Sequence, residues 1–306
     1  MSSIDPFRPS RLRRSVLCVP AINKRALQKF TTLDCDAIIF DLEDSVAPSK
    51  KEEARENLKT FFAEQPLPDK ERIIRINALD TPFARADIDL VTQLCPDAVL
   101  LPKVSEPQSV LALIDNLSDR DAPDDLRIWA MIETARGILN AAAIAETGRT
   151  RQSRLDCFVI GLNDLRKETG VMPLPGRDYL SSWMMQTLLA ARAYGLDIID
   201  SVFNDFKDEA GFEAECRQGK AMGFNGKMLI HPLQIEAANQ TFGLDEQGIR
   251  EAEDIIAAFA RPEAEDLNVI EIDGKMVERL HLVQAQALVH KAQLIKARRQ
   301  AQGKMP

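Results

Sequence analysis

Short apolar runs alternate with amphipathic segments along most of this chain. Eight such runs, each followed by a segment of helical periodicity, recur at intervals of roughly 25–35 residues between about residues 14 and 240. The runs are residues 16–20, 37–44, 72–77, 98–103, 127–134, 155–165, 196–202 and 227–232. Strand–helix alternation predicts a parallel sheet, and eight units predict an α/β fold in which the sheet closes into a (β/α)8 TIM barrel.

An open, doubly wound sheet is the alternative architecture. Its nucleotide-binding form is disfavoured, because no G-x-G-x-x-G follows the first run and no G-x-x-x-x-G-K-[ST] phosphate loop occurs. The periodic segments predict helices over residues 23–32, 48–62, 82–94, 135–146, 178–194 and 207–222, with others after residues 106 and 232.

Polar side chains gather where the apolar runs end. They are Asp41, Glu43, Asp44, Arg75, Asn77, Lys103, Glu133, Asp164, Asp200, Ser201 and His231. In a barrel these ends face one mouth, where such enzymes place their chemistry. Strands also end simply where polar residues begin, but that explains polarity and not a mixture of acids with Arg, Lys and His.

Glu133 and Asp164 are the two acids around which we interpret the site. Each ends an apolar run, so on neighbouring parallel strands, roughly 5 Å apart, the two carboxylates would share one hard cation. The alternative is that each acid caps the helix that follows it.

Composition narrows the class of protein. The chain has 306 residues, of which 45% are hydrophobic and 28% charged, with a net charge of −8, so we expect no nucleic-acid partner. We expect no membrane span, because no apolar run approaches ~20 residues, and no secretion signal after the basic stretch 10–14. The five scattered cysteines predict buried free thiols in a reducing cytoplasm.

The segment after residue 242 has a different character. It predicts an amphipathic helix over 245–260, a hairpin with an Asp-Gly turn over 267–278, and a final helix over 279–299. We therefore divide the chain into an N-terminal arm (1–13), a barrel domain (14–242) and a C-terminal extension (243–306).

An ordered set of motifs runs from residue 14 to residue 234, and the resemblance that it carries covers about residues 13–300. It comprises RSxxxVP (14–20), DLEDSVxPxxKxxAR (41–55), RIN (75–77), LPK (101–103), IETA (132–135), GLNDL (161–165) and NGKMLIHPxQ (225–234). Together these motifs resemble the citrate lyase β-subunit-like family of the HpcH/HpaI aldolase superfamily. The resemblance implies a TIM barrel, a Mg2+ ion (with Mn2+ as the alternative), and carbon–carbon cleavage or formation on citryl-, citramalyl- or malyl-CoA. It also implies partners: 2-oxo acids, acyl-CoA, and further copies of the chain in a homotrimer or hexamer.

The resemblance also assigns roles, position by position. Glu133 and Asp164 match the metal ligands, and Glu43 and Asp44 match acids that hold metal-bound water. Arg75 matches the residue that binds the substrate's carboxylate, a planar group that a guanidinium can grip with two parallel hydrogen bonds.

Two lysines are further candidates for substrate binding. Lys51 would reach a phosphate of CoA or, as the plainer interpretation, lie on a solvated helix face. Lys103 would be an electrostatic group in the mouth; a Schiff-base role is disfavoured, because a metal would be redundant beside it.

The C-terminal extension departs from the family pattern. In the family this extension covers a neighbouring subunit's mouth and carries G-x-M-[IV]-D-x-P, whose Asp is the acid or base at the acetyl carbon. Residues 274–280 read GKMVERL, so Glu278 replaces that Asp and Leu280 the Pro. A carboxylate one methylene further out puts the usual chemistry in question, because a displacement of about 1 Å can cost ~100-fold in rate.

The sequence thus predicts a Mg2+-dependent enzyme that cleaves a short 3-hydroxyacyl-CoA ester into a 2-oxo acid and an acyl-CoA by retro-Claisen chemistry. Three alternatives stay open. They are hydrolysis of the thioester, a CoA-free 2-oxo-acid aldolase, and a non-catalytic subunit that retains the metal and oxo-acid site.

Overall fold

The computed structural model describes residues 11–64, 70–149, 153–301 and 303. Most of the predicted N-terminal arm lies outside these ranges. Chain contacts divide the molecule into two compact units, with the boundary between Phe242 and Gly243.

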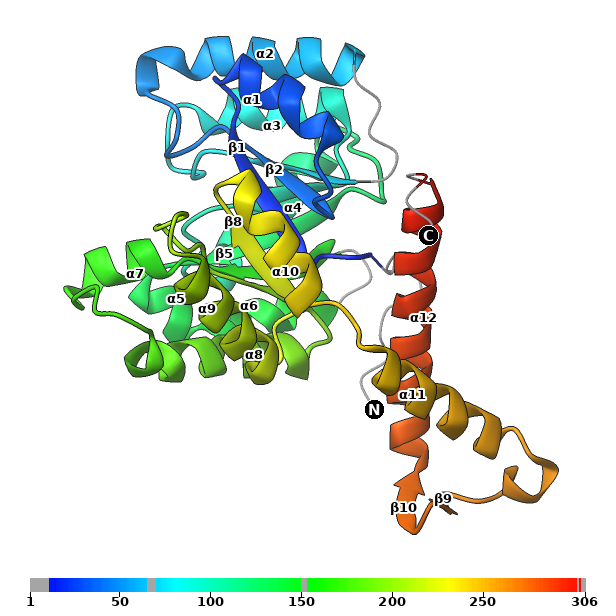
Figure 1. The fold of residues 1–306 in the computed structure, drawn as a ribbon. Helices are drawn as coiled ribbons and strands as arrows, with labels where there is room; N and C mark the ends of the chain where they lie inside the picture. Colours follow the sequence, from blue (N-terminus) through cyan, green and yellow to red (C-terminus); the bar gives the residue numbers. More distant parts are fainter. Residues whose placement is uncertain (1–10, 65–69, 150–152, 302, 304–306) are drawn as a thin grey trace. The chain divides into compact units, whose positions relative to one another are not determined.

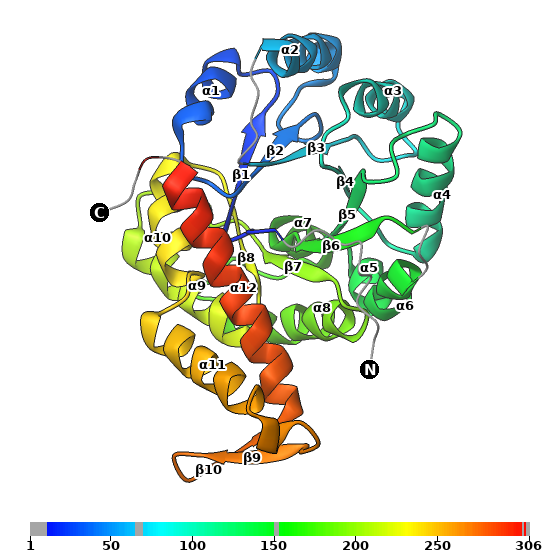
Figure 2. The ribbon, with the colours of Figure 1, turned by 90° about the vertical axis from the view of Figure 1, so that its right-hand side faces the viewer.

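The first unit is a closed barrel of eight parallel strands in sequential order (Figures 1 and 2). The strands are β1 (Ser15–Pro20), β2 (Ala37–Asp41), β3 (Glu71–Arg75), β4 (Ala98–Leu101), β5 (Arg127–Ile132), β6 (Leu155–Ile160), β7 (Asp197–Asp200) and β8 (Gly226–Leu229). Strand β8 pairs with β1 through Val16 and Met228, which closes the sheet. The predicted (β/α)8 barrel and all eight of its strands are confirmed.

Helices follow the strands, and all but α7 form a ring outside them (Figure 2). They are α1 (Lys24–Lys29), α2 (Lys51–Glu64), α3 (Ala84–Leu94), α4 (Pro107–Ser118), α5 (Ala135–Leu139), α6 (Ala141–Glu146), α7 (Leu162–Thr169), α8 (Ser181–Ala193), α9 (Glu209–Met222) and α10 (Ile235–Thr241). The prediction of one helix over 135–146 is wrong. Asn140 interrupts it between α5 and α6 and donates a hydrogen bond from its side chain to the Ser105 carbonyl, at 2.8 Å.

Both faces of the barrel strands are buried. Ile39, Leu100 and Trp129 belong to the apolar cluster that fills the barrel interior. Their neighbours along the strands, such as Ile38 and Phe40, belong to the larger cluster formed with the surrounding helices. Burial on both faces explains why the strands appear in the sequence as continuous apolar runs.

The amino end of the barrel is closed by a buried ion cluster around Arg13. Its guanidinium pairs with Glu71 at 2.6 Å, with Asp156, and with Asp197 at 2.7 Å, and it lies 4.7 Å from the ring centroid of Trp129. Because this end is closed, the chemistry is left to the carboxyl ends of the strands.

The cysteines are free thiols in different environments. Cys35, Cys157 and Cys216 are buried, as predicted, and Cys18 is half-buried. The prediction is wrong for Cys95, which is exposed because it ends α3 in the left-handed conformation, with φ 46°.

The second unit contains two helices and a small hairpin. Helix α11 (Glu246–Phe259) is followed by β9 (Val269–Ile272), β10 (Lys275–Glu278) and α12 (Arg279–Ala301). The hairpin is confirmed: the two strands are antiparallel, and Asp273 and Gly274 both adopt positive φ, as a tight Asp-Gly turn requires. Within the described ranges, no helix is long and apolar enough to span a bilayer.

Candidate active site

Arg75 ends β3 and lies beside Asp41 at the end of β2, because the two residues are register partners. The guanidinium donates from Nε to Oδ1 of Asp41 at 2.6 Å and from Nη2 to Oδ2 at 2.7 Å. Burial works against the charge of Asp41, but Arg75 and hydrogen bonds from Ser45 and Glu43 lower its pKa overall. Asp41 thus fixes the guanidinium by one edge, while Nη1 lies beside Glu43 and donates to Sδ of Met131 at 3.8 Å.

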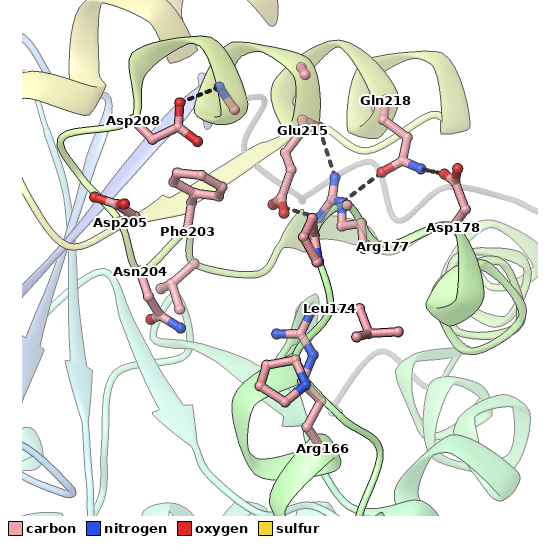
Figure 3. Close-up of a pocket in the computed structure, with 16 residues that line it drawn as sticks. Arg166, Leu174, Arg177, Asp178, Phe203, Asn204, Asp205, Asp208, Glu215 and Gln218 are labelled. Atoms are coloured by element: carbon pink, nitrogen blue, oxygen red, sulfur yellow. Dashed lines mark hydrogen bonds and ion pairs between the residues drawn. The ribbon is translucent and has the colours of Figure 1, made fainter.

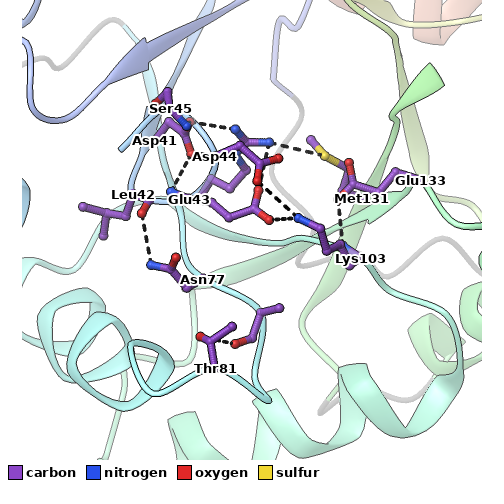
Figure 4. Close-up of polar contacts among 12 residues, drawn as sticks. Asp41, Leu42, Glu43, Asp44, Ser45, Asn77, Thr81, Lys103, Met131 and Glu133 are labelled. Carbon is purple, nitrogen blue, oxygen red and sulfur yellow. Dashed lines mark hydrogen bonds and ion pairs between the residues drawn. The ribbon is translucent and has the colours of Figure 1, made fainter. Parts of the chain in front are cut away.

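Glu43 follows the end of β2 and occupies the centre of this group of side chains (Figure 4). Its Oε1 accepts a short hydrogen bond from Lys103 Nζ, and its Oε2 lies 3.2 Å from Nη1 of Arg75. The Arg75 contact has the distance of an ion pair without hydrogen-bond geometry, so within the described ranges the buried Oε2 atom accepts no hydrogen bond. Such an atom has an open coordination position.

Glu133 follows β5 directly and is 1% exposed. Its Oε1 accepts a 2.8 Å hydrogen bond from the backbone N–H of Lys103, which adopts a φ of 53°. Gly161, next to it at the end of β6, makes room for the carboxylate, since a Cβ there would lie 2.6 Å from Glu133 Cβ and 2.7 Å from Oε2. Glu133 does not cap α5, because the side chain of Thr134 does.

Asp164 does not end a strand. Strand β6 ends at Ile160, and Asp164 lies in the first turn of α7, half-buried. The prediction that both carboxylates leave strand ends is therefore wrong for this residue. It remains a neighbour of Glu133, because its negative charge contributes to the raised pKa of that group.

The electrostatics of the group show an excess of buried negative charge. Burial and the charges of Glu43 and Asp164 raise the pKa of Glu133 to about 8, although the Lys103 amide and Arg75 work in the opposite direction. Burial and Asp44 likewise raise the pKa of Glu43. Burial would lower the pKa of Lys103, but its hydrogen bond and charge contact with Glu43 raise it to about 12. Carboxylates held this way gain a neutralising partner when a cation binds.

These residues fit a magnesium ion that keeps part of its water shell. In the described ranges, no three or more His, Cys, Asp or Glu side chains converge closely enough to enclose a metal by themselves. Mg2+ usually takes one or two protein carboxylates and completes its six oxygens with water and substrate. The crowded carboxylates and the open Oε2 of Glu43 match that donor set.

Lys51 lies elsewhere than predicted. It is 5% exposed, so the interpretation as a charge on a solvated helix face is wrong. Its Nζ donates to the carbonyls of Leu42 at 2.7 Å and Glu43 at 2.8 Å. These contacts give the lysine a role in holding the loop that carries Glu43, while contact with CoA stays a prediction.

Two other predicted mouth residues have structural partners. The side chain of Asp200 lies in a buried ion cluster, where it pairs with Arg177 at 2.6 Å and Lys227 at 3.1 Å. Nδ1 of His231 accepts a hydrogen bond from the Leu233 amide at 3.3 Å, so one ring nitrogen is occupied by the backbone.

Glu278 belongs to the second unit, at the end of β10. Its side chain is exposed, and its backbone N–H donates to Nδ1 of His281 at 2.8 Å. Its catalytic assignment stays a prediction.

Asp41 and Asp87 are site residues to which sequence reasoning gave no role. Asp87, on α3, accepts hydrogen bonds from the backbone and side chain of Asn77, and from Arg55 at 2.9 Å. An acid and an arginine at corresponding ends of consecutive predicted strands were the available signal for the Asp41–Arg75 pair. Asp87 sits in an amphipathic helix and carries no such signal.

Three comparisons with known proteins bear on this geometry. The family model described as HpcH/HpaI aldolase/citrate lyase matches residues 14–232. The (3S)-malyl-CoA thioesterase of Cereibacter sphaeroides is 45% identical over 287 residues, covering 93% of this chain and 96% of that protein. The mitochondrial citramalyl-CoA lyase of Rattus norvegicus is 33% identical over 294 residues, covering 93% and 87%.

A solved structure resembles most of the chain. The crystal structure of the protein CitE from Mycobacterium tuberculosis, in complex with magnesium, acetoacetate and coenzyme A, aligns with a TM-score of 0.70 and 27% identity. The alignment covers 92% of this chain and 98% of that one.

Proposed function

The chain belongs to the HpcH/HpaI aldolase/citrate lyase family, and from this premise we propose that it is a Mg2+-dependent lyase acting on a short 3-hydroxyacyl-CoA ester. The substrate would be of the malyl-, citramalyl- or citryl-CoA type, and the products a 2-oxo acid and an acyl-CoA. The main observation behind the proposal is that Glu43 and Glu133 lie near Arg75, whose guanidinium Asp41 holds by one edge.

Glu133 and Asp164 would hold the metal, with Glu43 and Asp44 orienting its water ligands. When bound, Mg2+ (or Mn2+) supplies Lewis-acid stabilisation of negative charge on a substrate oxygen. The raised pKa of Glu133 supports this assignment, because the cation would offset the repulsion between these carboxylates. The complex of Mycobacterium tuberculosis CitE with magnesium supports the choice of Mg2+ as the metal.

Arg75 would bind the carboxylate at the oxo-acid end of the substrate. Asp41 occupies the Nε edge of the guanidinium at 2.6 and 2.7 Å, so a substrate carboxylate would approach the Nη1 side, where Glu43 lies at 3.2 Å and Sδ of Met131 at 3.8 Å. A guanidinium that is already oriented loses little freedom when it binds a planar anion. Lys103 contributes positive charge beside Glu43.

Cleavage requires two proton movements. The 3-hydroxyl loses its proton as the C2–C3 bond breaks, and the electron pair of that bond passes to C2, forming an enolate of the acyl-CoA. That carbon then takes up a proton to give the released acyl-CoA. We assign the transfer at C2 to Glu278, contributed by a neighbouring copy of the chain in a trimer or hexamer.

Thioester hydrolysis is the second candidate function. Two observations favour it: the relatives that are 45% identical to the chain are named (3S)-malyl-CoA thioesterases, and Glu278 replaces the family Asp. Hydrolysis consumes water at the thioester carbonyl and leaves the carbon skeleton intact.

Product analysis distinguishes the two reactions. The purified protein is incubated with malyl-CoA and citramalyl-CoA, with Mg2+ or with EDTA. Carbon–carbon cleavage yields acetyl-CoA with glyoxylate or pyruvate, whereas hydrolysis yields free CoA with malate or citramalate. We expect Mg2+-dependent cleavage that disappears in Arg75→Ala. Free CoA without any acetyl-CoA would identify a thioesterase in place of the lyase, and no turnover of either ester would leave a citryl-CoA substrate, a CoA-free aldolase or a binding subunit.

A further inference from the structure

A pocket of about 650 Å³ lies in the barrel unit beside the carboxyl ends of β6 and β7 (Figure 3). Its walls come from α7, the segment leading into α8, the loop after β7, and α9. None of the residues assigned to the metal or to the substrate lines it. Its volume falls within the ~300–1,000 Å³ range of small-molecule sites.

One part of the wall is a rigid polar network. The guanidinium of Arg177, 1% exposed, donates to Asp200 at 2.6 and 2.7 Å and to Gln218 at 2.7 Å. Glu215 pairs with Lys227 at 3.1 Å, and Gln218 donates in turn to Asp178 at 2.7 Å. These groups are already partnered by one another, so they form the wall and have little capacity left for a ligand.

The other part of the wall is apolar. Pro173, Leu174, Val202, Phe203 and Ala214 contribute side chains to it. Leu174 is 55% exposed, so a ligand with an apolar body would remove hydrophobic surface from water there.

Arg166 is the exception among the polar residues of the lining. Its Nε is buried and donates to no acceptor, and across the described ranges its guanidinium forms no hydrogen bond or ion pair. Figure 3 shows the side chain at the edge of the pocket beside Leu174. A buried guanidinium N–H without an acceptor costs free energy that a ligand oxygen would recover.

We propose that this pocket is a second binding site, for a small organic monocarboxylate. The carboxylate pairs with the guanidinium of Arg166, and the apolar or aromatic body lies against Leu174 and Phe203. A planar carboxylate suits the fork of an arginine. The lining also carries Asp178, Asp205, Asp208 and Glu215, whose charges disfavour a second negative group and therefore phosphorylated ligands.

Calorimetric titration of the full-length protein with benzoate and hexanoate tests the proposal. EDTA is present throughout, which removes the metal site as a competing carboxylate site and makes the outcome independent of catalysis. We expect saturable binding that weakens at least ~10-fold in Arg166→Gln, as loss of a charge-assisted pair predicts. Succinate, with two charges, should bind more weakly than either monocarboxylate.

Three variants make the result specific. Arg217→Gln is the control. Arg217 is an exposed arginine on α9, between the lining residues Ala214 and Gln218, but it does not line the pocket itself, so this variant should bind both ligands normally. Ala214→Phe fills the pocket without changing its charge and should abolish binding, while Arg75→Ala should retain it. Unchanged affinity in Arg166→Gln, loss of binding in Arg75→Ala, or no saturable binding up to ~10 mM ligand would each overturn the proposal.

Discussion

Two neighbours position Glu133. One of them lacks a side chain, and the other supplies a backbone hydrogen-bond donor. Gly161 leaves the space that the carboxylate occupies, and the Lys103 amide donates to it. The residue is therefore held by main-chain geometry on both sides. We expect even small changes there to be transmitted to the metal site.

Gly161→Ala tests this directly. The added Cβ would lie 2.6 Å from Glu133 Cβ, so the carboxylate must move, and we expect Mg2+ affinity to fall by ~10–100-fold, as for other residues that position a ligand. Calorimetric titration with Mg2+ measures the change. Gly248→Ala is the matched control, because a Cβ there meets atoms only at 3.5 Å or beyond. Equal affinities in the two variants would contradict the argument.

Glu133→Gln separates stability from function. The pKa of Glu133 is raised to about 8 from its usual 4.5, so the folded state favours the protonated acid. Its contribution to stability is complete below pH ~4.5 and is lost as the pH rises toward 8, where folding requires a buried charge. In EDTA we expect the Tm of the uncharged variant to rise relative to that of the wild type between pH 5.5 and pH 8. Each kcal/mol of avoided charge burial corresponds to a Tm difference of ~2–4 °C.

The same variant should gain no stability from added Mg2+, whereas the wild type should. Thermal unfolding at both pH values, with EDTA and with Mg2+, provides the four measurements. A difference in Tm between wild type and variant that is the same at pH 5.5 and pH 8 in EDTA would refute the prediction.

At the level of secondary-structure elements, buried hydrogen bonds fix the connection between β2 and α2. Lys51 donates to the carbonyls of Leu42 and Glu43, and Asn77 donates to that of Leu42 at 3.0 Å. Asp87 in turn fixes Asn77. This network determines where the Glu43 carboxylate enters the site.

Lys51→Met is expected to destabilise the protein by ~1–3 kcal/mol, because two buried carbonyls lose their charged donor. It should lower kcat as well, through displacement of Glu43. The neighbouring Lys50, which is exposed and pairs with Glu53, provides the control Lys50→Met with an effect near zero. Urea unfolding and steady-state kinetics measure both. A raised KM for the CoA ester with unchanged stability would instead support the CoA-phosphate role of Lys51.

At the level of the whole molecule, the two proposed catalytic groups lie in different units of the chain. Arg75 is in the barrel and Glu278 at the end of the hairpin. If Glu278 acts in a neighbouring subunit, a complete site combines two copies of the chain. The proposed trimer would then be a requirement for activity.

Mixed oligomers of Arg75→Ala and Glu278→Ala test this arrangement. Each variant alone should be inactive, whereas co-expression in equal amounts should restore about a quarter of wild-type activity, since half of the barrels meet half of the intact hairpins. Light scattering should show a trimer or hexamer. Persistent inactivity of the mixture would place Glu278 within its own subunit's site, and activity of Glu278→Ala alone would place the residue outside catalysis.

The barrel and its order of elements were predictable from the sequence alone. Apolar runs such as 37–41 and 127–132 are local patterns, and burial of both strand faces makes them continuous. The Asp-Gly turn of the hairpin is equally local, because only a few residue types tolerate positive φ at both central positions. Glu133 and Arg75 also followed from their positions at the ends of such runs.

Only the tertiary structure decided how these residues pair. Arg75 meets Asp41 across 34 positions of sequence, and Lys103 meets Glu43 across 60, through strand neighbours that no local pattern specifies. For the same reason the structure differs from the sequence prediction at two residues. Lys51 is a buried donor and not a surface charge, and Asp164 lies in a helix and not at the end of a strand. The pocket beside Arg166 likewise exists only once α7, α9 and the loop after β7 are assembled. Periodicity records which face of an element is buried, whereas contacts between distant residues arise only when the barrel closes.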